Sequence, residues 1–60
     1  MDYPKFTINN STDGQYYFNL HASNTKIIAT SEMYTTKQNC ENGIASVKEN
    51  APIAGVEDLT

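Results

Sequence analysis

The chain has 60 residues, a formal net charge of −3 and four lysines without any arginine. This length allows one small domain, and the scattered lysines exclude the clustered positive charge that gives nucleic-acid binding most of its affinity. The apolar runs are far shorter than the roughly 20 residues that span a bilayer, and the N-terminus lacks a signal-peptide core. We therefore expect a cytoplasmic protein with neither a nucleic-acid partner nor a membrane partner.

A domain of this length struggles to bury enough apolar surface to be stable alone. The single cysteine, Cys40, cannot form an internal disulfide and suits a reducing cytoplasm. The single histidine, His21, has no other Cys or His nearby and so predicts no ordinary zinc site. We expect no metal and no other cofactor. A second copy of the chain therefore remains as the means of stabilising so small a domain.

Three β-strands are predicted in the first half of the chain. Residues 5–9 alternate polar and apolar, residues 15–22 do the same, and residues 26–31 are rich in β-branched side chains. Alternation predicts a sheet with one covered face and one wetter face. In the second strand the covered set is Tyr16, Phe18, Leu20 and Ala22, and the wetter set is Gln15, Tyr17, Asn19 and His21.

Clusters of turn-forming residues separate these strands. In residues 11–14, Gly14 can adopt a positive φ angle, and in residues 23–25 Asn24 is able to take the left-handed conformation. Connections this short join antiparallel neighbours. The first half therefore predicts a three-strand antiparallel meander.

The periodicity then changes to that of a helix. Thr35 stands three residues before Gln38, which matches a capping box, while Lys48 suits the last turn and Pro52 predicts the end. Small and apolar residues recur at spacings of three and four, typical of one helix stripe: Cys40, Gly43, Ile44, Val47 and Ala51.

Asn42-Gly43 is a strong tight-turn signal, yet it lies inside this stripe. A strand through the segment would have no apolar face, so we expect the helix to continue through Gly43. A glycine inside a helix costs about 1 kcal/mol relative to alanine. We expect the reason to be a close approach of the helix to the sheet.

The tail, residues 52–60, has linker character at Pro52 and Gly55. Residues 56–59 fit either a short strand or a disordered end, because their apolar side chains lie three apart.

Two groups of polar residues are candidate sites. Glu32, Tyr34 and Lys37 lie with Ser31 at the strand-to-helix junction, where they could perform acid–base chemistry, although capping and covering roles are favoured there. Tyr17, Asn19 and His21 share the wetter sheet face. Cys40 lies on the apolar stripe and is expected to be a buried small hydrophobe rather than a nucleophile.

The ordered set of motifs resembles the YegP-like family, small bacterial domains of unknown function, over about residues 6–50. Thr25 stands where the family has a glycine, and His21 where it has Lys or Arg, which makes the wetter face less basic. The shared pieces are Phe6-x-Ile8, Asp13-Gly14-x-Tyr16-x-Phe18-x-Leu20-x-Ala22-x-Asn24, Ile28, Ser31-Glu32-x-Tyr34-x-x-Lys37 and Asn42-Gly43-Ile44-x-Ser46-Val47.

This resemblance implies a β-β-β-α-β unit, found as single or tandem repeats. Two units form one continuous sheet and exchange their C-terminal strands, so one unit per chain implies a homodimer in which residues 56–59 cross to the partner. The family assigns no catalytic residues, and none is carried over.

We therefore expect a two-layer α+β fold in one domain, residues 1–60, with a core at 5–51 and a linker and exchanged strand at 52–60. The favoured function is a non-enzymatic homodimeric interaction module, which could also bind another protein through Tyr17, Asn19 and His21. The alternative is a small-molecule binder or enzyme at Glu32, Tyr34 and Lys37. A pocket of about 300 Å³ or more with converging polar groups would favour the alternative.

Overall fold

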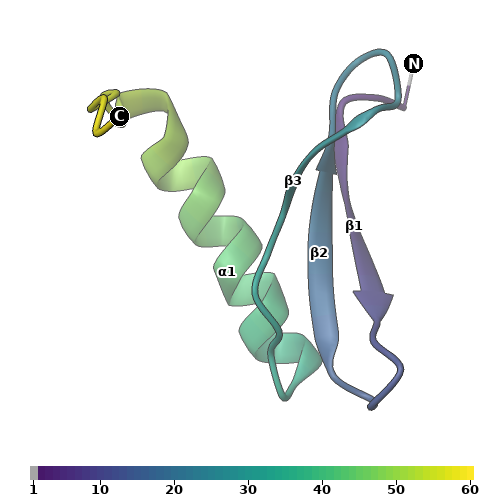
Figure 1. Ribbon diagram of the computed structural model, residues 1–60. Coiled ribbons are helices and arrows are strands. Elements are labelled where there is room, and N and C mark those ends of the chain that lie inside the picture. The colour runs from purple at the N-terminus through teal and green to yellow at the C-terminus, as the bar shows by residue number, and fades with distance from the viewer. Residues whose placement is uncertain (1) are drawn as a thin grey trace.

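A computed structural model describes residues 2–60, and Met1 of the expected domain lies outside the described residues. A three-stranded antiparallel sheet with the strand order β1-β2-β3 precedes a single long helix that crosses one face of the sheet (Figure 1). This is the α+β architecture expected from the sequence. The elements are β1 Lys5–Asn10, β2 Tyr16–His21, β3 Ile27–Thr30, α1 Lys37–Asn50 and a short 3-10 helix, η1 Ala51–Ile53.

The β1–β2 connection is a tight turn followed by one left-handed residue. The Gly14 N–H donates to the Ser11 carbonyl at 3.1 Å, and the Ser11 N–H donates to the Gln15 carbonyl at 2.8 Å. Gly14 has a φ of 85°, a conformation that glycine adopts at little cost. The expected role of Gly14 is confirmed.

The β2–β3 connection repeats this hydrogen-bond pattern with different residues. The Thr25 N–H donates to the Ala22 carbonyl at 2.9 Å, and the Ala22 N–H donates to the Lys26 carbonyl at 2.8 Å. Thr25, with a φ of 72°, is the left-handed residue, and Asn24, which could also have taken this conformation, does not take it. The loop needs positive φ at its fourth position, and the Asn24 side chain instead accepts from the Lys26 N–H at 3.1 Å.

The core is very small. Among the described residues, only Phe18 and Cys40 are buried hydrophobic residues. The Phe18 ring meets the edge of the Phe6 ring at 5.7 Å between centroids and stacks on Tyr34 at 6.3 Å. These three rings form the contact between the sheet and the first turns of α1, and the remaining apolar side chains stay at least partly exposed.

The helix runs through the Asn42-Gly43 pair, as expected. A Cβ atom added at Gly43 would lie 2.9 Å from Cζ of Tyr34 and 3.2 Å from Cε2 of Phe18, and closer still to the Tyr34 hydroxyl. These separations are shorter than normal carbon contacts. Gly43 therefore allows the helix to approach the sheet, which confirms the predicted reason for glycine there.

The helix begins one residue later than the capping box predicted. Thr36, not Thr35, is the N-cap, and its hydroxyl accepts from the Asn39 N–H at 3.1 Å. The Gln38 side chain does not reach back to the cap but donates to Asn42 Oδ1 at 3.2 Å. Two backbone hydrogen bonds to Tyr16 hold Tyr34 at the edge of the sheet. The chain therefore needs one more residue to leave the sheet before the helix begins.

The tail makes no fourth strand on its own sheet. Residues 54–60 lie outside the helices and strands, at the end of the helix and away from the sheet (Figure 1). Ile53, Val56 and Leu59 are 82%, 99% and 84% exposed. Within residues 2–60, the C-terminal strand of the expected β-β-β-α-β unit is therefore not formed.

Candidate functional site

The face of the sheet opposite α1 carries a ladder of polar side chains. The β1–β2 register pairs Lys5 with His21 and Asn9 with Tyr17, and between them Thr7 faces Asn19. Because alternate strand residues share a face, Tyr17, Asn19 and His21 lie together here as predicted from the sequence. We call this surface the open face.

His21 is more firmly held than a lone surface histidine would be. Its Nδ1 lies 3.1 Å from the Thr25 carbonyl oxygen, which can only accept, so Nδ1 carries the proton. In the neutral ring, Nε2 therefore accepts from the Thr7 hydroxyl at 3.1 Å. The Asn9 amide donates in turn to Thr7 Oγ1 at 3.3 Å. This chain of bonds fixes the orientation of the imidazole.

Other side chains of the open face also bond to one another. The Thr30 hydroxyl donates to Asn19 Oδ1 at 2.8 Å. The Tyr3 ring meets the His21 ring edge-on at 5.6 Å, and the Lys5 ammonium lies 4.5 Å from the Tyr3 ring centroid. With these groups partnered within the chain, the open face suits a broad contact surface better than convergence on one small ligand.

The strand-to-helix junction separates its predicted residues. Tyr34 turns inward against Phe18, whereas Glu32 and Lys37 remain exposed. Ser31 has a structural contact, because its hydroxyl accepts from the Phe18 N–H at 2.9 Å and donates to the Glu32 carbonyl at 2.7 Å. These two hydrogen bonds hold the bend that the chain makes after β3.

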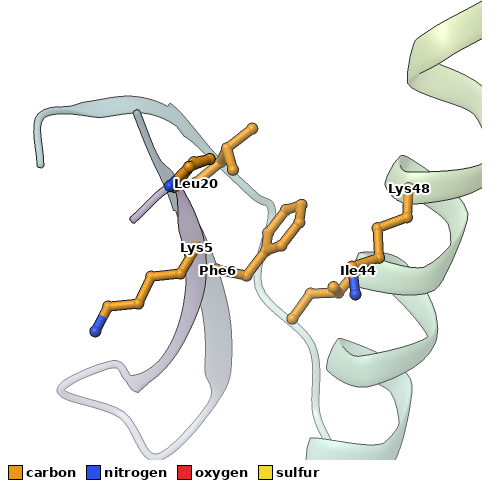
Figure 2. A pocket seen from close by; sticks show the side chains of 6 residues that line it. Lys5, Phe6, Leu20, Ile44 and Lys48 are labelled. Atoms are coloured by element: carbon orange, nitrogen blue, oxygen red, sulfur yellow. The ribbon is translucent and has the colours of Figure 1, made fainter. Parts of the chain in front are cut away.

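A cleft of about 410 Å³ opens elsewhere, between the sheet and the later turns of α1 (Figure 2). The Phe6 ring points from β1 toward the helix, and Ile44 points back toward it. Phe6 and Leu20 are paired across the strands. The lining residues are Pro4, Lys5, Phe6, Leu20, Ile44 and Lys48.

The cleft is apolar with one cationic wall. Lys48 runs along the helix toward Ile44, whereas the Lys5 ammonium points away from the helix (Figure 2). None of the six predicted site residues lines the cleft. The sequence analysis predicted the apolar faces of the strands and the helix but not the cleft between them. The cleft depends on the angle at which the helix and the sheet diverge, and this angle is set by tertiary packing.

Cys40 is fully buried, as predicted, and its environment opposes nucleophilic chemistry. Burial, with a smaller effect from the Glu41 charge, raises the pKa of the Cys40 thiol above its ordinary value of 9.0. The thiol therefore remains protonated near neutral pH.

Residues 2–60 contain no group of three or more His, Cys, Asp or Glu side chains placed to hold a metal ion. In that same part of the chain, no helix is long and apolar enough to cross a membrane.

The sequence matches a family of known proteins over most of its length. Residues 11–58 match the family described as a domain of unknown function, DUF1508. The UPF0339 protein YegP of Yersinia pestis is 55% identical over 47 residues, covering 78% of this chain and 42% of that protein. The UPF0339 protein PA0329 of Pseudomonas aeruginosa is 49% identical over 55 residues, covering 92% of this chain and 50% of that protein. The chain thus spans half or less of the length of these relatives.

A solved structure has the same fold. The solution NMR structure of a protein from Haloferax volcanii superimposes with a TM-score of 0.82 at 36% sequence identity. The match covers 90% of this chain and 92% of that chain, so the two are similar in length as well as in architecture.

Proposed function

Because the chain belongs to the DUF1508 family of YegP-like proteins, whose function is unknown, we propose that it is a non-enzymatic, homodimeric interaction module of the cytoplasm. The observation that carries the proposal is the exposed apolar tail. Ile53, Val56 and Leu59 are each more than four-fifths exposed, and burial of such side chains against a second copy would be favourable.

The small interior supports the same proposal. Phe18 and Cys40 alone are buried hydrophobic residues among residues 2–60, whereas stable small domains need a larger core or external support. A second copy that covers the helix–sheet layer would supply that support. The exchanged C-terminal segment is the means by which we propose the two copies join.

The lengths of the relatives agree with a two-unit assembly. The matched region makes up 42% of the Yersinia pestis protein and 50% of the Pseudomonas aeruginosa protein, which leaves room there for a second unit. We infer that two copies of this chain do together what two units would do in one longer chain.

The open face is the surface that we propose for contact with another protein. Tyr17, Asn19 and His21 lie side by side on it, and tyrosine is enriched at protein interfaces. The internal hydrogen bonds of His21 hold the surface in one arrangement before binding, which lowers the entropy lost on association.

Sedimentation equilibrium at micromolar concentration tests the homodimer. We expect a mass near twice 6.7 kDa, and a shift toward the monomer when Val56→Ser and Leu59→Ser are combined, because the apolar surface of the tail is then lost. The matched control is Val56→Ile with Leu59→Met, which keeps that surface and should keep the dimer. A folded monomer for the unaltered chain at all concentrations would refute the proposal.

A further inference from the structure

We propose that Asn42 is a latent deamidation site, which α1 keeps closed in the folded chain and which opens when the helix unfolds. The inference goes beyond the proposed function and does not depend on the homodimer. The Asn42-Gly43 pair is the tight-turn signal that the helix overrides. The same pair favours attack of the backbone on the asparagine side chain, because Gly43 has no Cβ to obstruct the approach.

The reaction needs only water as a second reactant. The backbone nitrogen of Gly43 gives up its proton to solvent and attacks Cγ of Asn42. The new C–N bond replaces the bond from Cγ to the side-chain nitrogen, which leaves as ammonia. Water then opens the resulting succinimide ring at either carbonyl group. One product is aspartate, and the other is isoaspartate, in which the backbone runs through the side chain.

The helix opposes this reaction, although Asn42 is exposed to water. Gly43 lies beyond the first turn of α1, so its N–H belongs to those that donate to a carbonyl one turn earlier. The nearly planar succinimide ring also requires the ψ angle of Asn42 to leave the helical value of about −42°. The Gln38 amide donates to Asn42 Oδ1 at 3.2 Å and holds the side chain along the helix.

The chain places its most reactive asparagine in its longest regular element. Asn42 is the only asparagine that precedes a glycine in the sequence. Asn24 lies in an exposed loop, but it precedes Thr25, whose β-branched side chain obstructs the attack. The helix is therefore the main protection, and it rests on a core in which Phe18 and Cys40 are the buried hydrophobic residues of the described part of the chain.

The isoaspartate product cannot refit the folded structure. Its extra backbone atom falls directly before Gly43, where even an added Cβ would lie 2.9 Å from Cζ of Tyr34 and 3.2 Å from Cε2 of Phe18. The extra atom also shifts Ile44 relative to Cys40 on the apolar stripe, since the stripe depends on helical spacing. Deamidation therefore converts a period of unfolding into a permanent loss of the fold.

A comparison of native and unfolded full-length chain tests the protection. Both samples are incubated at one pH and temperature, without and with urea, and peptide mass spectrometry follows the change from amide to carboxylate at Asn42. We expect the native rate to be lower by on the order of a hundredfold or more, because only the small unfolded fraction reacts. Asn42→Gln is the chemical control and should abolish the signal in urea, since glutamine cannot form the five-membered ring.

Intermediate urea concentrations test the mechanism without any variant. Below the midpoint, the rate should rise in proportion to the unfolded fraction measured by circular dichroism. A native rate equal to the rate in full urea would overturn the inference, because the helix would then give no protection.

A pair of variants at the start of α1 gives a second test. Thr36→Ala removes the cap that accepts from the Asn39 N–H, and we expect it to raise the native rate about fivefold. Thr35→Ala is the matched control, because Thr35 is the exposed neighbour that does not cap the helix, and it should leave the rate unchanged. If Thr36→Ala lowered stability in urea but reacted no faster than Thr35→Ala, helix opening would not control the reaction.

The two products test the structural consequence. After chromatographic separation, the aspartate product should refold with the helical circular dichroism of an Asn42→Asp variant, because an exposed carboxylate can still accept from Gln38. The isoaspartate product should lose this signal. An isoaspartate product that refolds fully would contradict the permanent loss of the fold.

Discussion

Thr25 adopts the positive φ angle that its loop requires, although this conformation suits glycine better than threonine. Gly14 and Thr25 occupy equivalent positions in two loops with the same hydrogen-bond pattern, and both have positive φ. A non-glycine residue in this conformation costs about 1–2 kcal/mol because its Cβ crowds the backbone. Thr25 is therefore a position where the chain stores strain.

We expect Thr25→Gly to raise the free energy of unfolding by about 0.5–1 kcal/mol, since the relieved strain exceeds the entropy that glycine gains on unfolding. Urea unfolding monitored by circular dichroism measures the change. The reciprocal variant, Gly14→Thr, is the matched control and should destabilise. A Cβ at Gly14 would meet no atom within 4 Å, so that loss would come from the backbone alone. A neutral Thr25→Gly would show that the loop tolerates threonine without strain.

At the scale of elements, the contact between α1 and the sheet depends on one glycine. We expect Gly43→Ala to lower the free energy of unfolding by about 1–3 kcal/mol, because overpacking against Tyr34 and Phe18 outweighs the better helix propensity of alanine.

Two variants sharpen this prediction. Tyr34→Phe removes the hydroxyl nearest to the added methyl group, so it should recover part of the loss in the Gly43→Ala background. Gly55→Ala is the control in open space, where an added Cβ meets nothing within 4 Å, and it should change stability little. If Gly43→Ala stabilised the protein, the helix would have to lie farther from the sheet than described here.

At the scale of the whole molecule, the proposed dimer links folding to association. If two chains complete each other, the unfolding transition involves two chains per native molecule, and stability rises with concentration. We expect a tenfold increase in protein concentration to raise the apparent free energy of unfolding per dimer by about 1.4 kcal/mol. Thermal unfolding at two protein concentrations that differ tenfold would measure it.

The tail variant gives the control for this linkage. Val56→Ser with Leu59→Ser should unfold at a lower temperature that varies less with concentration, because fewer chains are then associated. A midpoint independent of concentration in the unaltered chain would mean that folding does not depend on a partner.

The sequence by itself determined the elements and their faces, because both depend on local periodicity and turn chemistry. The alternation in β2 identified Phe18 as a core residue, and the helical stripe identified Cys40 and Gly43. The predicted N-cap at Thr35 was one residue too early, because the Tyr16–Tyr34 backbone bonds decide where the helix begins. Loop geometry likewise decided that Thr25, and not Asn24, takes the left-handed conformation.

Only the tertiary structure decided how the elements diverge. The angle between α1 and the sheet leaves Phe6, Leu20 and Ile44 around an open cleft and the tail in solvent, and periodicity along one chain carries no information about that angle. Tertiary packing also turned the Tyr34 ring inward against Phe18, whereas Glu32 and Lys37 remain exposed. Local patterns specify which surfaces are apolar, whereas long-range packing determines which of them remain uncovered.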